Sequence, residues 1–289
     1  MSVILVFGAS GVVGQFLLPR LAARGDRVVA ISRGVRADIH IASNIEWRYG
    51  DLCAEVPPFP PIDTVLSLGP LDAFAAWFAR AAPQGARRVI ALSSMSAESK
   101  RDSIDAAERE LSERLRSAEA LLMQSARQNN AACTIFRPTL IYGTGRDRSL
   151  APIARFARRW HVLPIPSATG LRQPVHADDL ALACVAVLDN AMTFGNTYAL
   201  GGGERLPFGD LLARIAAGPP RCALPLPVPI AFVRTAARLA RGRIGPGMLA
   251  RLSEPLIADN AAAERDFGYT PRAFRAQDVL GSADSPNSD

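Results

Sequence analysis

The chain has 289 residues, of which 49% are hydrophobic and 21% are charged, and its formal net charge is +6. This composition can build a sizeable core, and 22 glycines with 22 prolines are too few for a fibrous or low-complexity chain. The longest apolar run, Leu180–Leu188, is far shorter than the roughly 20 residues that span a bilayer, so we expect no membrane insertion.

The cysteine and arginine content indicates which kinds of site and partner to expect. The four cysteines have no metal-ligand spacing, so we expect a metal-free, reduced and cytoplasmic protein. Lys100 is the only lysine among 33 basic residues. The arginines are scattered apart from a run at Arg234, Arg238, Arg241 and Arg243, which we interpret as a solvated helix face. We therefore expect no nucleic-acid partner.

The first third of the chain alternates strand and helix signals. A strand is expected at Val3–Phe7, a glycine turn at 8–14, a helix at Gln15–Arg24 and a second strand at Arg27–Ser32. Strand, turn, helix and strand in this order open a parallel α/β sheet.

The same alternation continues to about residue 145. Further strands are expected at Ile45–Tyr49, Thr64–Leu68, Arg88–Ser93 and Cys133–Arg137, and helices at Asp72–Ala82, Ser103–Asn129, Arg146–Arg159 and Ala177–Asn190. The fold class is therefore α/β, with a doubly wound Rossmann parallel sheet.

Residues 1–145, completed by about 173–200, form the dinucleotide-binding core. Residues 146–172 and 201–280 form a smaller, mostly helical lobe on the substrate side, and 281–289 a disordered tail.

The glycine turn predicts a dinucleotide site. Gly8 permits the sharp turn, Gly11 lets a pyrophosphate approach the backbone, and Gly14 lets the helix pack on the sheet. The backbone N–H groups within residues 8–14, which include Ser10, Val12 and Val13, then face the phosphates at a helix N-terminus.

The end of the second strand predicts which dinucleotide is bound. An NAD site usually has Asp or Glu there, whereas this chain has Ser32 and Arg33. An arginine fork can bind a 2′-phosphate, so NADP(H) is favoured over NAD, which stays open. Arg36 is a second candidate for this contact.

These residues resemble the extended short-chain dehydrogenase/reductase superfamily, in particular its nucleotide-sugar epimerase/dehydratase branch. The resemblance covers nearly the whole chain. The motifs that carry it are the glycine turn, Gly50-Asp51-Leu52, Ala91-Leu92-Ser93-Ser94, Arg137-Pro138-Thr139-Leu140-Ile141-Tyr142-Gly143, Val175-His176-Ala177-Asp178-Asp179-Leu180 and Phe267-Gly268-Tyr269-Thr270-Pro271-Arg272.

The resemblance implies roles for several residues. Asp51 and Leu52 would lie by the adenine ring, Leu68 and Gly69 would line the cofactor, and Pro138 would approach the nicotinamide end. His176 and Asp178 would tie the two lobes together. The resemblance leaves a homodimer open.

The chain departs from the family at its catalytic helix. Typical members carry Tyr-x-x-x-Lys there, because a nearby ammonium stabilises the phenolate that moves the proton. Aligning the family's glutamate with Glu119 places Leu115 in the lysine position and Leu111 in the tyrosine position. Neither leucine can carry a proton.

Three other residues are candidates for the proton transfer that the missing Tyr-x-x-x-Lys pair would perform. Ser94 and Ser96 lie near the family's serine, and Ser96-x-x-x-Lys100 has the spacing of a serine–lysine nucleophile pair, although it falls in a polar segment expected to be a loop. Tyr142 is the phenol nearest to a family motif.

Two hypotheses of function follow. The first is an atypical, NADP(H)-binding oxidoreductase or epimerase-like enzyme acting on a small polar substrate, which a nucleotide sugar would fit. The second is a dinucleotide-binding redox sensor or scaffold without turnover. Superfamily branches that lost the pair, including members resembling a respiratory complex I subunit, follow this second route, and residues 203–227 look more like those branches.

Overall fold

The structure is a computed structural model that describes residues 2–34, 42–81, 83–167, 169–218, 223–229 and 252–281. The expected contact at Arg36, the arginine run at 234–243 and all but the first residue of the expected disordered tail lie outside these ranges.

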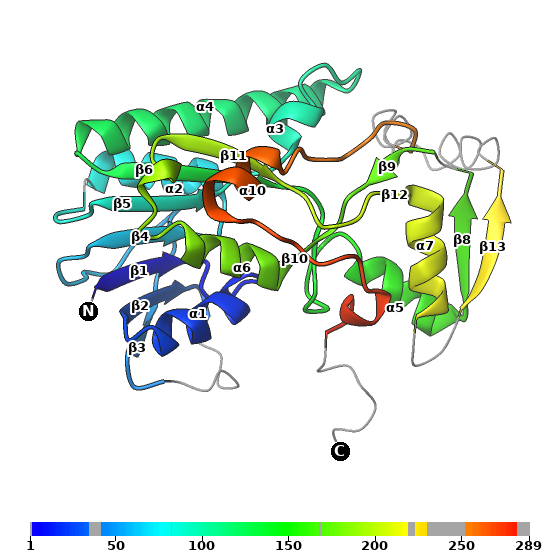
Figure 1. The fold of residues 1–289 in the computed structure, drawn as a ribbon, viewed down its shortest axis with the longest axis horizontal. Coiled ribbons are helices and arrows are strands. Elements are labelled where there is room, and N and C mark those ends of the chain that lie inside the picture. The colour runs from blue at the N-terminus through cyan, green and yellow to red at the C-terminus, as the bar shows by residue number, and fades with distance from the viewer. Residues whose placement is uncertain are drawn as a thin grey trace.

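A seven-stranded parallel sheet forms the centre of the larger lobe (Figure 1). Its strands are β1 (Val3–Phe7), β2 (Arg27–Ser32), β3 (Ile45–Tyr49), β4 (Thr64–Ser67), β5 (Arg88–Leu92), β6 (Ala132–Pro138) and β11 (Asn196–Leu200), in the order β11-β6-β5-β4-β1-β2-β3. The strand order reverses between β1 and β4, and in such sheets ligands bind beyond the carboxyl ends of the strands at this point. The expected doubly wound Rossmann fold is confirmed.

Two apolar layers cover the two faces of the sheet. Helices α1 (Gly14–Ala23) and α6 (Ala177–Ala186) pack on one face, while α2 (Leu71–Ala81) and α4 (Ala106–Gln128) pack on the other. The described ranges also contain the short helices α3 (Ser96–Ser99) and α10 (Ala261–Phe267) and the 3-10 turns η1 (Ala191–Thr193) and η2 (Ala276–Asp278). None of the helices described there is long and apolar enough to cross a membrane.

Two helices begin later than the sequence suggested, because an aspartate caps each of them. The Asp105 carboxylate accepts a hydrogen bond from the Ala107 N–H at 3.0 Å, so α4 starts at Ala106 rather than at 103. The Asp147 carboxylate accepts from the N–H groups of Leu150 and Ala151, so α5 (Ala151–Trp160) starts five residues after 146.

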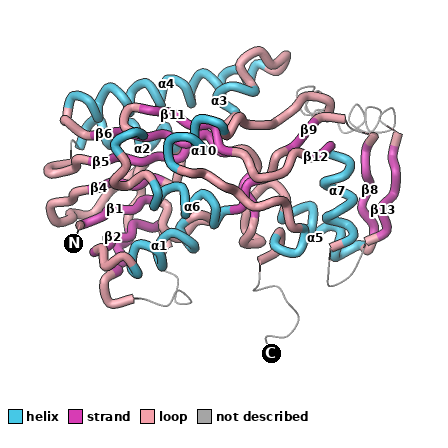
Figure 2. The backbone as a smooth tube through the Cα atoms, in the orientation of Figure 1, coloured by secondary structure: helices cyan, strands magenta, loops and turns pink. Residues whose placement is uncertain are grey.

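A smaller lobe follows β7 (Ile141–Tyr142) (Figure 2). In the part of it that the structure describes, α5 and α7 (Phe208–Ala217) are accompanied by short strands. These strands are β8 (Val162–Pro166), β9 (Leu171–Arg172), β10 (Val175–His176), β12 (Leu206–Pro207) and β13 (Leu224–Val228), paired as β7/β10, β9/β12 and β8/β13. The core of this lobe is a separate apolar cluster that includes Leu163, Leu211 and Ile215.

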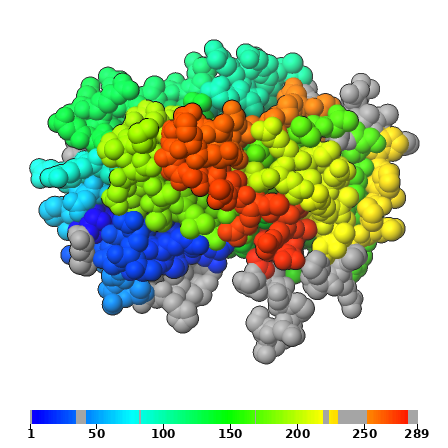
Figure 3. All heavy atoms as spheres, viewed as in Figure 1, coloured from blue at the N-terminus to red at the C-terminus, as the bar shows by residue number. Residues whose placement is uncertain are grey.

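Charged side chains join the lobes at the start of α6. Arg272 donates to Asp178 and Asp179 at 2.8 Å each, and Arg20 on α1 lies 2.7 Å from Asp178. Figure 3 shows the C-terminal segment, in orange and red, crossing the surface between the lobes. The tie expected through Asp178 is therefore present in the geometry.

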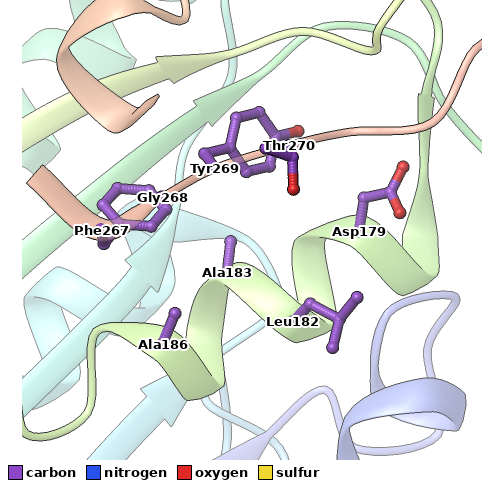
Figure 4. A pocket seen from close by; sticks show the side chains of 8 residues that line it. All are labelled: Asp179, Leu182, Ala183, Ala186, Phe267, Gly268, Tyr269 and Thr270. Carbon is purple, nitrogen blue, oxygen red and sulfur yellow. The ribbon is translucent and has the colours of Figure 1, made fainter. Parts of the chain in front are cut away.

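A small hollow of about 80 Å³ lies beside this junction, between α6 and residues 267–270 (Figure 4). Asp179 is the carboxylate that lines it, and that group is already bound by Arg272. We interpret the hollow as a packing defect between α6 and the C-terminal segment.

Candidate functional site

The glycine turn connects β1 to α1 at the switch point of the sheet. Gly8 has a φ of +71°, and its carbonyl accepts the Gly11 N–H at 2.9 Å. A Cβ added at Gly14 would lie 2.0 Å from the Ala9 carbonyl oxygen, so only glycine lets α1 start this close to the turn. The turn thus requires glycine at the positions that the sequence singled out.

The turn leaves donors available at the N-terminus of α1. The backbone N–H groups of Val12 and Val13 have no hydrogen-bond acceptor in the described part of the chain. Val13 is the N-cap of the ten-residue helix α1 and Val12 precedes it, at the end of the helix where the partial positive charge of the dipole also favours an anion. A pyrophosphate bound there would satisfy these donors.

The end of β2 lies beside the turn, since β1 and β2 pair in parallel up to Phe7 and Ile31. The Ser32 hydroxyl is 2.7 Å from the Ser10 hydroxyl and 2.8 Å from the Gly34 carbonyl oxygen. Arg33 follows it with an exposed side chain. No carboxylate occupies this strand end among the described residues.

The other expected cofactor residues lie at carboxyl ends of the same sheet. The Leu68 N–H donates to the Phe7 carbonyl at 3.0 Å, which places Leu68 and Gly69 against the glycine turn. A Cβ added at Gly69 would meet nothing within 4 Å. Gly69 therefore borders open space, as a residue that lines a ligand site would.

Asp51 and Leu52 follow β3 at one side of the sheet, and Pro138 ends β6 near its other side. The Asp51 carboxylate accepts the Cys53 N–H at 2.9 Å and so shapes the loop after β3, while Leu52 packs on the apolar layer beneath it. Pro138 ends β6, and its carbonyl accepts the Met95 N–H at 2.9 Å. The expected cofactor residues described by the structure thus lie at the carboxyl ends of the strands, spread across the sheet from β3 to β6.

An arginine of the smaller lobe also reaches the turn. Arg146 Nη1 donates to the Ser10 carbonyl at 3.4 Å. The preceding Gly145 is held on both sides, because its N–H donates to Val279 and its carbonyl accepts Arg155 at 2.6 Å. Sequence reasoning missed Arg146, since no local pattern indicates a contact across 136 positions.

The face of α4 where the family has its catalytic pair holds an ion pair and two leucines. The buried Glu119 carboxylate accepts hydrogen bonds from the Ser93 hydroxyl and from Arg137, and this raises the pKa of Arg137. Leu115 and Leu111 lie one and two turns before Glu119 on the same face. These turns offer no proton donor to a substrate.

The serine candidates lie close by, between β5 and α3. The Ser94 hydroxyl accepts the Ser96 N–H at 3.1 Å. Ser96 begins α3, so the segment expected to be a loop is a short helix. Lys100 turns to Glu108, with 3.6 Å between Nζ and Oε1, and the structure records no hydrogen bond between Lys100 and Ser96. The geometry does not support a serine–lysine nucleophile.

Tyr142 lies inside the protein, packed between His176 and Phe274. It is fully buried, its hydroxyl accepts the Arg275 N–H at 3.3 Å, and burial raises its pKa to about 12. A phenol in these surroundings holds its proton and contacts no solvent, which argues against the catalytic role expected for Tyr142.

His176 joins the same inter-lobe packing. Its Nδ1 accepts the Asp178 N–H at 3.1 Å and caps α6, and burial lowers the pKa of the imidazole. A Cβ at Gly143 would lie 2.4 Å from His176 Nε2, so the ring fills the space beside that glycine. This position agrees with the tying role expected for His176.

Comparison with known proteins connects this geometry to a family. Residues 78–201 match the model described as the NAD dependent epimerase/dehydratase family. The chain is 27% identical over 322 residues to the mitochondrial NADH dehydrogenase (ubiquinone) 1 alpha subcomplex subunit 9 of Arabidopsis thaliana, with 95% of this chain and 75% of that protein covered.

Solved structures give the same fold. UDP-glucuronic acid 4-epimerase from Bacillus cereus, in complex with NAD, has a TM-score of 0.72 at 15% identity, over 98% of this chain and 95% of that one. UDP-N-acetylglucosamine 4-epimerase from Bacillus cereus has a TM-score of 0.67 at 14% identity, over 97% of both chains. The chain therefore has the fold of the extended short-chain dehydrogenase/reductases and carries, over residues 78–201, the sequence pattern of the NAD-dependent epimerase/dehydratase family.

Proposed function

We propose that this protein binds NADP(H) across the carboxyl ends of β1, β2 and β4. The observation that carries the proposal is the pair of Val12 and Val13 N–H groups, which lack acceptors in the described chain and lie at the N-terminus of α1. A diphosphate bridge would accept from both, and Gly69 borders the open space beside them.

The preference for NADP(H) over NAD(H) rests on the end of β2. A carboxylate there would repel a 2′-phosphate, whereas the hydroxyl of Ser32 and the guanidinium of Arg33 can both donate to one. Ser32 is held in place by Ser10 and Gly34, and Arg33 is exposed with no ion pair to any other described residue. The UDP-glucuronic acid 4-epimerase structure named above is a complex with NAD, so this preference needs its own test.

We further propose that residues 146–172 and 201–280 form the substrate side, for a small polar substrate of the nucleotide-sugar kind. The bound nicotinamide would exchange a hydride with such a substrate. The chain itself must then hold a proton at the reacting oxygen, and the Ser94 hydroxyl is the group we assign to that position, with Ser96 fixing its orientation through the backbone.

A second function is favoured by the face of α4. With leucine at 111 and 115, that face offers no proton carrier, and the chain is 27% identical to the Arabidopsis NADH dehydrogenase subunit. A dinucleotide-binding sensor or scaffold without turnover needs the glycine turn alone. NADPH oxidation against a panel of carbonyl substrates separates the two, because turnover lost in Ser94→Ala supports the enzyme, and tight binding without turnover supports the sensor.

Arg33→Asp tests the cofactor preference by calorimetry. Removing a charged hydrogen bond to the 2′-phosphate should weaken NADPH binding by roughly 10- to 100-fold and affect NADH much less. Arg101→Asp, which makes the same charge change at an exposed residue of the loop after α3, is the control. Equal loss of both dinucleotides, or no loss, removes Arg33 from the site.

A further inference from the structure

Arg146 belongs to the smaller lobe, but its guanidinium lies against the glycine turn of the larger one. Its Nη1 donates to the Ser10 carbonyl at 3.4 Å, which is long for a hydrogen bond. The side chain is exposed, and among the described residues no carboxylate pairs with it. A guanidinium has five N–H donors, so most of those of Arg146 stand beside the turn without an acceptor from the described chain.

The backbone on both sides of Arg146 is fixed. Gly145 has a φ of +68°, its N–H donates to the Val279 carbonyl at 3.0 Å, and a Cβ added there would overlap the Leu280 carbonyl oxygen. Asp147 on the other side is 6% exposed, and its carboxylate accepts backbone N–H groups at the start of α5. The structure therefore sets the position of the Arg146 backbone and leaves the side chain exposed, which lowers the entropy cost of binding a ligand.

The contact with Ser10 brings the guanidinium within reach of the proposed diphosphate site. Ser10 and Val12 are separated by Gly11 alone, and two residues of extended chain span at most about 7 Å. The N–H groups of Val12 and Val13 lack acceptors in the described chain. A diphosphate that accepted from these groups would thus lie within reach of the Arg146 side chain.

A diphosphate needs more positive charge than the start of α1 supplies. The N-terminus of a helix carries about half an elementary charge, whereas each phosphate of the bridge is an anion. Arg20, the basic residue of α1, is already paired with Asp178 at 2.7 Å. Arg33 follows β2 and is assigned above to the 2′-phosphate at the other end of the adenosine. Arg146 can add a full charge, and its planar fork matches two phosphate oxygens.

We propose that Arg146 binds the diphosphate bridge of the dinucleotide and so links dinucleotide binding in the larger lobe to the first segment of the smaller lobe. The inference rests on the proposed function, because that function places the dinucleotide at the glycine turn. It goes further by making the segment from Gly145 to the start of α5 part of the cofactor site. Arg146 is a binding residue in this account and carries no proton.

Calorimetry with three ligands tests the contact. NADPH and NADH share the diphosphate, so Arg146→Gln should weaken both by the same factor, about 10-fold or more, whereas Arg33→Asp should weaken mainly NADPH. Arg146→Lys keeps the charge without the fork and should fall between glutamine and arginine. Adenosine 2′-monophosphate lacks the bridge, so its affinity should stay unchanged in Arg146→Gln. A residue that merely held the lobes together would not distinguish these ligands.

Hydrogen exchange tests the link between the lobes. Saturating NADPH should slow the exchange of amides between residue 146 and the first turn of α5 in the unmodified chain. Arg146→Gln, studied at the same saturation, should show no such slowing. Arg148→Gln is the matched control, since it removes an exposed arginine two positions later, and it should behave as the unmodified chain in both experiments.

The melting temperature without ligand should be the same in all these variants, because the Arg146 side chain is exposed and makes one long hydrogen bond. Unchanged affinity of Arg146→Gln for both dinucleotides, with binding intact in the unmodified chain, would overturn this inference and leave the proposed function standing. Loss confined to NADPH, or equal loss in Arg148→Gln, would also overturn it. An unmodified chain that binds neither dinucleotide would overturn both.

Discussion

Glu119 and Arg137 form a partly buried ion pair between α4 and the end of β6, and the Ser93 hydroxyl donates to the same carboxylate. Arg137 also reaches Glu98 on α3 at 2.6 Å. The pair therefore ties α4 to the end of β6, one helical turn after Leu115. Its role in this chain is structural.

Replacing this carboxylate should cost stability without affecting the dinucleotide. Glu119→Gln leaves the Arg137 guanidinium without its main counter-charge, and the free energy of unfolding should fall by about 1–3 kcal/mol. Urea unfolding measures the loss, with Glu113→Gln, an exposed position on the same helix, as the control. Equal stability of the two variants would show that the ion pair contributes nothing net.

Substitutions at Gly69 should affect cofactor binding without affecting the stability of the fold. Because an added Cβ there meets no atom within 4 Å, Gly69→Ala and Gly69→Val should keep the melting temperature of the unmodified chain. If the open space holds a dinucleotide, affinity for NADPH should fall progressively from glycine to alanine to valine. Gly14→Ala gives the contrasting case, since its Cβ would overlap the Ala9 carbonyl and should destabilise the fold itself. Unchanged affinity in Gly69→Val would place the dinucleotide elsewhere.

His176 should give the stability a defined pH dependence. Burial, reinforced by Arg272, lowers its pKa below the ordinary 6.5, so the unfolded chain takes up this proton more readily than the folded one. The contribution is fully present above about pH 6.5 and is lost as the pH falls toward the lowered folded pKa. Melting temperatures between about pH 8 and pH 5 should therefore fall less in His176→Asn, which can still cap α6, than in the unmodified chain. Parallel profiles would contradict the assignment.

The sequence predicted the sheet well because the pattern there is local. Val3–Phe7, Arg27–Ser32 and Ile45–Tyr49 are strands with the expected bounds, since each is a short β-branched or aromatic run between turn residues. The glycine turn was predicted equally well, because Gly8, Gly11 and Gly14 are each required by the local geometry of the turn.

The contacts at the junction of the lobes and in the smaller lobe were predicted less well from the sequence, because they join residues that are far apart in the chain. Arg146 meets Ser10, and Arg272 meets Asp178, across more than 90 positions, and no periodicity signals such pairs. Tyr142 illustrates the same limit, since its place in a family motif did not show that Phe274 and His176 would enclose it. The start of α5 was misjudged because the Asp147 cap resembles any other acidic residue in a helical stretch.

Titration of the purified chain with NADPH and NADH by calorimetry tests the central claim most directly. Both dinucleotides should release binding heat, with NADPH the tighter ligand, and Gly69→Val should weaken both while the protein remains folded. A folded protein that gives no heat with either dinucleotide would contradict the account.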